Sequence, residues 1–486
     1  MMNTLTLTDL LLVSPMIALF LASLVPITVK VLRGNVEQPA VATLIQGLAG
    51  VFISGLLLFS FSAGKTAFSQ ALVFDGLTLA VGLIALMASG YAMVLMYENP
   101  STNGRQFSEL IFLALSSALG MLILVASNDL LMTFIGLEIM SLALYLMIAK
   151  SHEEKLSKES ALKYFILGSF ASAIFLYGIS FIFGSAGSTY LSDITLNAET
   201  LVGSHRLFLL GSVLVILGFC FKVSIAPFHA WTPDVYQGAP TPHTAFMATA
   251  IKAVSFGAFI RVLDTRALMG SENLFYFLQW LAVITMVVGN VAAVLQNNLK
   301  RVLAYSSIAH SGYLMVGLIT GGVSEDSTFA TSGVVFYLFA YSLMTLGAFA
   351  IVSLLEKDEN HSLQVDDLAG LAKKRPGLAL CLTIFLLSMA GIPPTIGFFG
   401  KFYLFTSAIG EGLLWLAIWG VINSVISAYY YLRPIVVMYM KDGGADLAPR
   451  SLLATKVVVI AAAILVVILG AFSGGFFQAV EKVLQV

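Results

Sequence analysis

Four ionisable side chains interrupt long apolar segments of the sequence. They are Glu138, Lys222, Lys252 and Lys401, and each lies within a stretch long enough to cross a bilayer. A charged side chain at the membrane centre costs about 2.5–3.5 kcal/mol on insertion scales. Four such charges are difficult to explain by structure alone. Because lysine and glutamate gain and lose protons, their placement indicates a route for a charged species, and the proton fits these groups best.

Two of the apolar segments also contain helix breakers at membrane depth. The first has Pro227, shortly after Lys222, and the second has Pro393 and Pro394, shortly before Lys401. Proline removes an amide donor and restrains the residue before it, so regular helix stops there. Backbone groups freed in this way are tolerated in a membrane only where protein or a hydrated cavity satisfies them. A break beside a buried lysine, occurring twice, therefore indicates two local functional sites.

Histidines add to these candidates. His310 lies in the segment 306–313, whose three serines share one helical face with it. Two interpretations stay open: a polar contact between helices, or a hydrated relay, since imidazole titrates near neutral pH. His229 and His243 flank the first break, where a loop or cap contact is favoured.

The elements that must position these residues are transmembrane helices. Of the 486 residues 59% are hydrophobic and 10% charged, and mean hydropathy is +0.94, whereas soluble proteins carry about 25% charged residues. This composition excludes a soluble enzyme, a disordered chain and a nucleic-acid binder. We predict an all-α polytopic membrane protein of about fourteen spans, at 8–29, 40–62, 73–96, 107–126, 129–149, 161–184, 206–226, 243–263, 274–296, 301–321, 329–355, 377–409, 412–435 and 453–473.

The separation of the two breaks predicts an internal repeat. Three N-terminal helices in 1–106 would precede one five-helix unit at 107–264 and a second at 274–435, with a last helix in 436–486. An odd number of helices inverts the second copy, as in transporters with a path near the midplane. Similar tripeptides, Asn-Asp-Leu and Asn-Asn-Leu, precede the helices of Glu138 and His310, which places these two residues near each other in the repeat.

Basic residues predict the orientation. Seventeen of the twenty-five Lys and Arg residues fall on the side of the first connection, which includes Lys30 and Arg33, and five fall on the other. The positive-inside rule then places both termini on the periplasmic side. No phosphate loop, haem-ligand pair, iron–sulfur cysteine set or nucleophile elbow occurs in the sequence, so we expect no cofactor and no metal in this chain.

Three long motifs carry a resemblance to a known family. The segments 218–240, 298–310 and 390–403 resemble the antiporter-like membrane subunits of respiratory complex I, above all the subunit N type, which is similar to mitochondrial subunit 2. The resemblance covers essentially the whole chain and implies fourteen helices with two inverted five-helix units. It implies that Glu138 pairs with Lys222, and that Lys252 and Lys401 continue the path. In the sister subunit M the last position is typically glutamate, so Lys401 favours subunit N.

This resemblance implies a function: one subunit of a proton-pumping NADH–quinone oxidoreductase in the bacterial inner membrane. Its partners would be neighbouring antiporter-like and small membrane subunits and the lipid bilayer. NADH, FMN, iron–sulfur clusters and quinone would belong to other subunits. A carboxylate near a buried lysine favours the charged form, and burial alone disfavours it. Glu138 close to Lys222 would thus hold the proton there, its withdrawal would drive the proton to Lys252, and Lys401 would pass it to the exit side.

Three other functions are open at this point. A multi-subunit cation/proton antiporter would share the same residues, and only co-purification would tell it apart. A passive membrane scaffold would tolerate neutralisation of the buried charges. A solute transporter would need a polar substrate cluster, and the sequence has none beyond the titratable residues.

Overall fold

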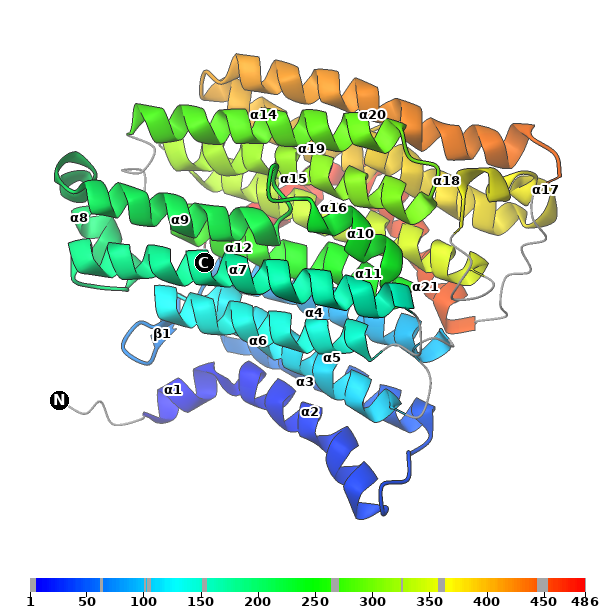
Figure 1. Cartoon of the computed structure of the whole chain (residues 1–486), viewed down its shortest axis with the longest axis horizontal. Helices are drawn as coiled ribbons and strands as arrows, with labels where there is room; N and C mark the ends of the chain where they lie inside the picture. The colour runs from blue at the N-terminus through cyan, green and yellow to red at the C-terminus, as the bar shows by residue number, and fades with distance from the viewer. Residues whose placement is uncertain are drawn as a thin grey trace.

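The computed structural model describes residues 6–61, 64–99, 102, 106–150, 155–263, 271–324, 327–356, 363–443 and 453–485. Long helices lie side by side in one bundle (Figure 1). Within the described ranges, twelve helices are long and apolar enough to cross a membrane. The other two predicted spans, 206–226 and 377–409, are those with proline breaks. The predicted polytopic all-α fold is confirmed, with one small addition, a two-stranded hairpin.

The N-terminal part consists of four helices and that hairpin. The hairpin packs against the first helix, because the Asp9 carboxylate accepts a hydrogen bond of 3.0 Å from the Phe68 amide. The elements are α1 (Leu7–Leu12), α2 (Ser14–Leu32), α3 (Ala40–Phe61), β1 (Lys65–Ala67), β2 (Leu72–Phe74) and α4 (Gly76–Glu98).

Two five-helix units follow, and each contains one broken helix. The first unit comprises α5 (Phe107–Ala126), α6 (Leu130–Ala149), α7 (Lys155–Ala186), the surface helix α8 (Leu191–Ser204), α9 (Arg206–Lys222), α10 (Trp231–Gly238), α11 (Thr241–Phe246), the π-helix η1 (Met247–Ile251) and α12 (Lys252–Leu263). The second comprises α14 (Glu272–Val294), α15 (Leu299–Val323), α16 (Ser327–Leu355), the 3₁₀ turn η2 (Val365–Leu368), α17 (Leu371–Lys374), α18 (Pro376–Ala390), α19 (Ile396–Gly410) and α20 (Leu414–Met440). The chain ends with α21 (Leu453–Ala471) and α22 (Ser473–Leu484).

A matching backbone bridge marks the repeat. In the first unit, residues 128–130 and 189–191 exchange two backbone hydrogen bonds of 2.9 and 2.8 Å. In the second unit, residues 297–299 and 363–365 exchange two bonds of the same lengths. The helix after the first bridge, α8, lies at the left end of the bundle, and α17, close after the second bridge, lies at the right end (Figure 1). The same local structure at opposite ends is what inverted copies require. The exact residue boundaries of the units stay a prediction, and residue 264 lies outside the described residues.

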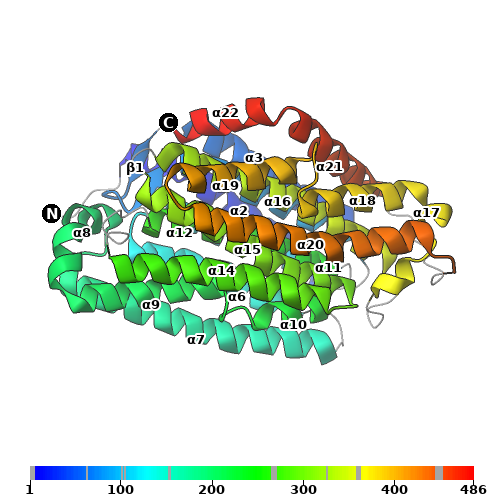
Figure 2. The same ribbon diagram turned by 90° about the horizontal axis from the view of Figure 1, so that it is seen from above.

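Both ends of the described chain lie at one end of the bundle. The described chain starts with α1, which packs against β1, and the C-terminal end of α22 lies near the same hairpin (Figures 1 and 2). The start of α4 touches the end of α22, since a Cβ on Gly76 would lie 1.9 Å from the Val483 carbonyl oxygen. Termini on the same side agree with an even number of membrane crossings.

Ion pairs join the helices at both ends of the bundle. At the hairpin end, Arg261 of α12 binds the Asp75 carboxylate with two bonds of 2.9 and 2.5 Å. Burial opposes the ionisation of Asp75, but the charge and hydrogen bonds of Arg261 outweigh it and keep the pKa of this carboxyl below its usual value. At the other end, Asp234 binds Lys163 of the first unit at 3.1 Å and Arg301 of the second at 2.9 Å. The two units are therefore joined through α10.

The centre of the molecule is formed by α15 and α16. In the most apolar 18-residue stretch of each of these helices, 94% of the residues are buried inside the protein. Polar side chains on α15 and α16 consequently meet other helices of this chain rather than lipid, and the candidate site is built around them.

Candidate functional site

Glu138 belongs to α6, and Lys222 contacts α6 on the same helical face, at the neighbouring turns of Ser141 and Tyr145. Glu138 is half-buried, and its carboxylate accepts a hydrogen bond from Ser172 of α7. Lys222, at the end of α9, is 3% exposed and donates to the Ser141 hydroxyl at 2.7 Å and the Tyr145 hydroxyl at 3.3 Å. No ion pair in the described ranges joins Glu138 to Lys222. In this structure Glu138 and Lys222 do not form the pair that the resemblance implies. Each charge is bound by a serine instead.

The first break follows Lys222 directly, and other helices satisfy its freed backbone. The peptide bond between Ala226 and Pro227 is cis. The Ala226 amide donates to the Thr285 hydroxyl of α14 at 3.0 Å, and the Val223 carbonyl accepts a bond of 2.5 Å from the Ser311 hydroxyl of α15. Helices of the second unit therefore provide hydrogen bonds to the backbone groups that the first break frees, which is necessary at membrane depth.

Lys252 lies at the start of α12, directly after the π-helix, and is 2% exposed. Its ammonium group donates to the Ser307 carbonyl at 2.6 Å, to the Ser307 hydroxyl, and to the Ser311 hydroxyl at 2.9 Å. It lies 5.4 Å from the centre of the Tyr341 ring. Since Ser311 also binds Val223, one hydroxyl links Lys252 to the first break.

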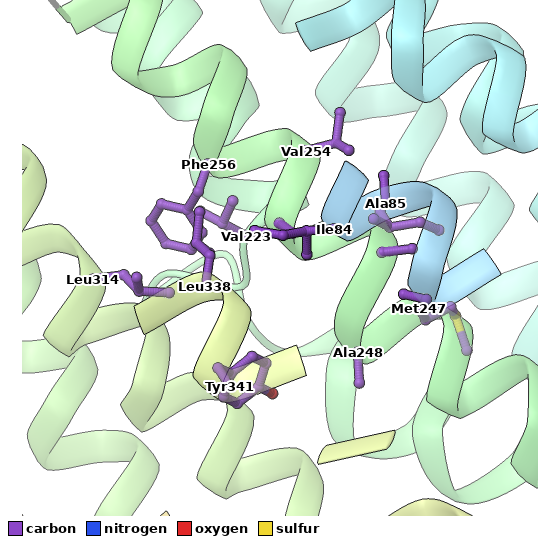
Figure 3. Close-up of a cluster of buried hydrophobic side chains, with 14 of the residues drawn as sticks. Ile84, Ala85, Val223, Met247, Ala248, Val254, Phe256, Leu314, Leu338 and Tyr341 are labelled. Atoms are coloured by element: carbon purple, nitrogen blue, oxygen red, sulfur yellow. The ribbon is translucent and has the colours of Figure 1, made fainter. Parts of the chain in front are cut away.

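The helical turn that follows Lys252 packs into an apolar cluster. Figure 3 shows Val254 and Phe256 of α12 in one buried cluster with Ile84 of α4, Leu314 of α15 and Leu338 of α16. The neutral oxygens of α15 are the hydrogen-bonding partners of this ammonium group in the described structure. Its environment differs in this respect from that of a surface lysine.

His310 is held by tyrosine hydroxyls. Its Nδ1 lies 2.6 Å from the Tyr337 hydroxyl, and its Nε2 lies 2.9 Å from the Tyr431 hydroxyl. Tyr431 in turn bonds to Ser306, and the Tyr341 ring lies 5.0 Å from the imidazole. The polar face predicted for residues 306–313 thus divides in two, with one part around His310 and the other, described above, at Lys252.

Lys401 completes the row at the second break. It is 4% exposed, and its ammonium group donates to the Ala390 carbonyl, the last of α18, at 3.2 Å. The group lies 4.8 Å above the Tyr313 ring. Lys401 therefore binds the second broken helix directly. At the first break, Ser311 links Lys252 to the Val223 carbonyl.

The second break has a tight geometry. The peptide bond between Pro393 and Pro394 is cis, and Gly391 has a φ of +85°. A Cβ on Gly391 would lie 3.2 Å from Cδ and 3.5 Å from Nζ of Lys401. The Gly397 amide, freed at the start of α19, donates to the Ser388 hydroxyl at 3.1 Å. Glycine at 391 thus provides both the left-handed turn and the room for the lysine.

The predicted residues therefore lie in a connected interior row, with partners that the sequence did not single out. Sequence reasoning missed Ser141, Tyr145 and Ser172 around the first charges, and the tyrosines Tyr337, Tyr341 and Tyr431 around Lys252 and His310. The four-residue spacing of Tyr337 and Tyr341 on one helical face was the available signal. The described residues contain no group of His, Cys, Asp or Glu that could hold a metal ion.

Comparisons with known proteins agree with this arrangement. Residues 127–427 match a family described as NADH:quinone oxidoreductase/Mrp antiporter, TM. NADH-quinone oxidoreductase subunit N of Bdellovibrio bacteriovorus is 69% identical over 98% of both chains. A chain of respiratory complex I from Thermus thermophilus matches with a TM-score of 0.81 and 31% identity, over 96% of this chain and 99% of that one.

A chain of the Mrp complex from Dietzia sp. DQ12-45-1b shares the fold, with a TM-score of 0.81 at 17% identity, over 99% of this chain and 97% of the other. The family match spans most of the chain, including both breaks and every residue of the row. The high identity to a subunit N over nearly the whole length narrows the assignment within that family. The chain therefore belongs to the NADH:quinone oxidoreductase/Mrp antiporter membrane family, in its NADH–quinone oxidoreductase subunit N branch.

Proposed function

We propose that this chain carries protons across the membrane as a subunit of NADH–quinone oxidoreductase. The proposed path uses Glu138, Lys222, Lys252, His310 and Lys401. Family membership and the name of the 69% identical relative support the general function. The contacts within the row support the assignment of these particular residues.

The observation that best supports this proposal is that three lysines are buried without an ion pair. Lys222, Lys252 and Lys401 are each less than 5% exposed, and none forms an ion pair in the described part of the chain. Their ammonium groups bind serine, tyrosine and carbonyl oxygens instead. A buried lysine that lacks a fixed counter-charge is close in free energy between its charged and neutral forms. Such a group can accept and release a proton, which a structural ion pair cannot do readily.

Glu138 acts as the switch at the start of the path. With its carboxylate on Ser172, it leaves the Lys222 ammonium with neutral partners only. A change of side-chain rotamer that brings the carboxylate to Lys222 would hold the proton on that lysine. The return of Glu138 to Ser172 would favour transfer of the proton toward Lys252.

The middle of the path runs along α15. Ser311 receives a hydrogen bond from Lys252 and donates one to the carbonyl beside Lys222. His310, one residue earlier on α15, sits between the tyrosines of α16 and α20. Small movements of α15 would consequently act on both buried sites at once.

A polar cavity lies beyond Lys401 and supports an exit there. It has a volume of about 610 Å³. The lining comes from the ends of α15 and α19 and the start of α16, and includes Thr320, Ser324, Thr406, Ser407 and Glu411. Ser407 lies about 9 Å along α19 from Lys401 at the helical rise of 1.5 Å per residue. A proton released from Lys401 would reach water through this cavity.

The proposal also includes the assembly and its orientation. NADH, FMN, iron–sulfur clusters and quinone would be bound by other subunits, and neighbouring antiporter-like and small membrane subunits would cover the flanks of this one. The location would be the bacterial inner membrane, with the bundle end that carries both termini on the periplasmic side.

The test replaces Lys252 or Lys401 with arginine in the intact complex. Arginine keeps the positive charge but does not release its proton in proteins. We expect Lys252→Arg and Lys401→Arg to lower ΔpH formation during NADH oxidation in inverted vesicles. The loss should equal the part of the pumping that this subunit contributes, and the complex should assemble normally on a native gel. Lys441→Arg, at an exposed lysine paired with Asp366, is the control and should pump normally.

Assembled arginine variants that pump at the wild-type rate would exclude a relay role and favour a passive scaffold. The same vesicles in sodium-free buffer test the cation, because pumping that required sodium would contradict a proton path. Co-purification with other pump subunits but without NADH-oxidising subunits would favour an independent antiporter.

A further inference from the structure

His243 is a buried histidine that the proposed path leaves without a role. Its side chain is 0% exposed, and neither ring nitrogen has a hydrogen-bond partner. A neutral imidazole carries one donor and one acceptor, and leaving such groups buried and unsatisfied is destabilising. The cap contact favoured from the sequence does not account for two unsatisfied nitrogens. They require a partner that is not among the described groups of this chain.

Neighbouring helices present further unsatisfied hydroxyls. α11, which carries His243, packs against α4 and α16, and α4 and α16 also pack against each other. α4 contributes the Tyr91 hydroxyl and α16 the Ser342 hydroxyl, both buried and without hydrogen-bond partners among the described residues. The buried Thr345 hydroxyl of α16 has Tyr341 as its neighbour one turn earlier on the same helix. We call these residues, together with His243, the polar cluster.

The register of α4 and α16 brings two members of the polar cluster to the same height. Ile84 and Leu338 share the buried cluster of Figure 3. Fifteen residues later on both helices, Asn99 donates to Ser353 at 2.9 Å. The two helices therefore run in the same direction, and Tyr91 and Thr345, each eight residues before that bond, lie level. Thr345 is one turn from Tyr341, the ring beneath Lys252.

The other end of the polar cluster reaches charged groups near the surface. Two residues before His243, Thr241 donates to the Glu356 carboxylate at 2.6 Å. Lys300 lies 3.5 Å from the same carboxylate and donates to the Thr241 hydroxyl at 3.3 Å. The polar cluster thus lies between the charges of Lys300 and Glu356 and the ammonium group of Lys252.

Water is the partner that fits these groups. Buried water molecules typically make about three hydrogen bonds to otherwise unsatisfied polar groups, and here three packed helices supply donors and acceptors within one interface. We propose that the polar cluster binds a short internal row of water molecules, which conducts protons from the Lys300–Glu356 end of α11 to Lys252. This inference rests on the proposed function and adds to it the loading side of the path.

The decisive variant is His243→Val in the intact complex. Because no protein group bonds to the imidazole, its replacement by a smaller apolar side chain should not prevent assembly. We expect it to remove more than half of the pumping that Lys252→Met removes, measured as ΔpH formation during NADH oxidation in inverted vesicles. His205→Val, the same change at an exposed position at the start of α9, should pump normally. His243→Gln, which keeps a donor and an acceptor, should retain more pumping than His243→Val.

A high-resolution cryo-EM map of the complex provides the second measurement. Water density within hydrogen-bonding distance of the His243 nitrogens is expected in the wild type and should be lost in His243→Val. A dry interface, or a protein side chain bound to both nitrogens, would overturn the inference. So would wild-type pumping in His243→Val, or equal loss in the Val and Gln variants, while Lys252→Met is impaired. If Lys252→Met itself pumps normally, the proposed function fails, and the map alone decides on the water site.

Discussion

At the scale of single residues, the charges of the proposed path are bound by neutral oxygens. Glu138 of α6 binds Ser172, and Lys222 binds Ser141 and Tyr145 on the same face of α6. A permanent ion pair at this depth would be stable but would hold its proton tightly. Separate serine partners instead leave the carboxylate without a fixed ion pair, as the proposed switch requires.

Removing the Ser172 hydroxyl should shift this balance. A hydrogen bond to a charged group contributes about 1.5–3 kcal/mol, so Ser172→Ala should move Glu138 toward Lys222 by about tenfold or more. We expect slower ΔpH formation in inverted vesicles, with normal assembly, and recovery in Ser172→Thr. Ser180→Ala is the control, because Ser180 is an exposed serine on the same helix that bonds to its own backbone. Unchanged pumping in Ser172→Ala would contradict the switch.

At the scale of elements, the two broken helices are the features that make the row possible. Each break frees backbone groups at membrane depth, and at each break one freed carbonyl is connected to a buried lysine. Ala390 is bound by Lys401 directly, and Val223 is linked to Lys252 through Ser311. A continuous helix would satisfy these carbonyls internally, so Lys401 would lose its Ala390 acceptor and Ser311 would lose its bond to the first break.

Gly391→Ala tests this coupling at the second break. Alanine in the left-handed conformation costs about 1–2 kcal/mol, and its Cβ would displace Lys401 from its place beside the turn. We expect an assembled complex with reduced pumping and a slightly lower melting temperature. Gly377→Ala, near the start of the same helix, where a Cβ meets no atom within 4 Å, should change neither quantity. Equal effects of the two substitutions would mean that Lys401 does not depend on the break.

At the scale of the whole molecule, the inverted repeat places similar structures at opposite ends of the bundle. The bridge before α6 and the bridge before α15 have the same hydrogen bonds but lie at opposite ends (Figure 1). Asp234 of the first unit binds Arg301 of the second, where the hydrogen bonds from Arg301 and Lys163 outweigh the effect of partial burial and lower the pKa of Asp234. The two units are consequently held as one body around α15 and α16.

Thiol labelling tests the orientation of the bundle in the membrane. We expect a cysteine at Glu199, on the exposed face of α8, to react with a membrane-impermeant reagent in intact cells, because that end carries few basic residues. A cysteine at Lys374, exposed in α17 at the opposite end, should react only after the membrane is opened. The reverse pattern would contradict the periplasmic placement of the termini.

The sequence by itself determined which segments cross the membrane, where two of them break, and which charges lie at membrane depth. These properties depend on the local composition of about twenty residues, because the bilayer excludes polar side chains and backbone whatever the neighbouring helices are. Twelve predicted spans are therefore found as continuous helices, and of the two exceptions one ends just before Pro227 and the other contains the pair Pro393 and Pro394.

Only the tertiary structure decided the partner of each charge. Lys252 binds serines fifty-five and fifty-nine residues away, and His310 binds a tyrosine one hundred and twenty-one residues away. Such contacts depend on which helices pack together and in which register, and hydropathy contains no information on either. The choice of Glu138 between Ser172 and Lys222 depends further on one side-chain rotamer. It is decided by free-energy differences of a few kcal/mol between contacts of similar strength, which the pattern of residues along the chain does not encode.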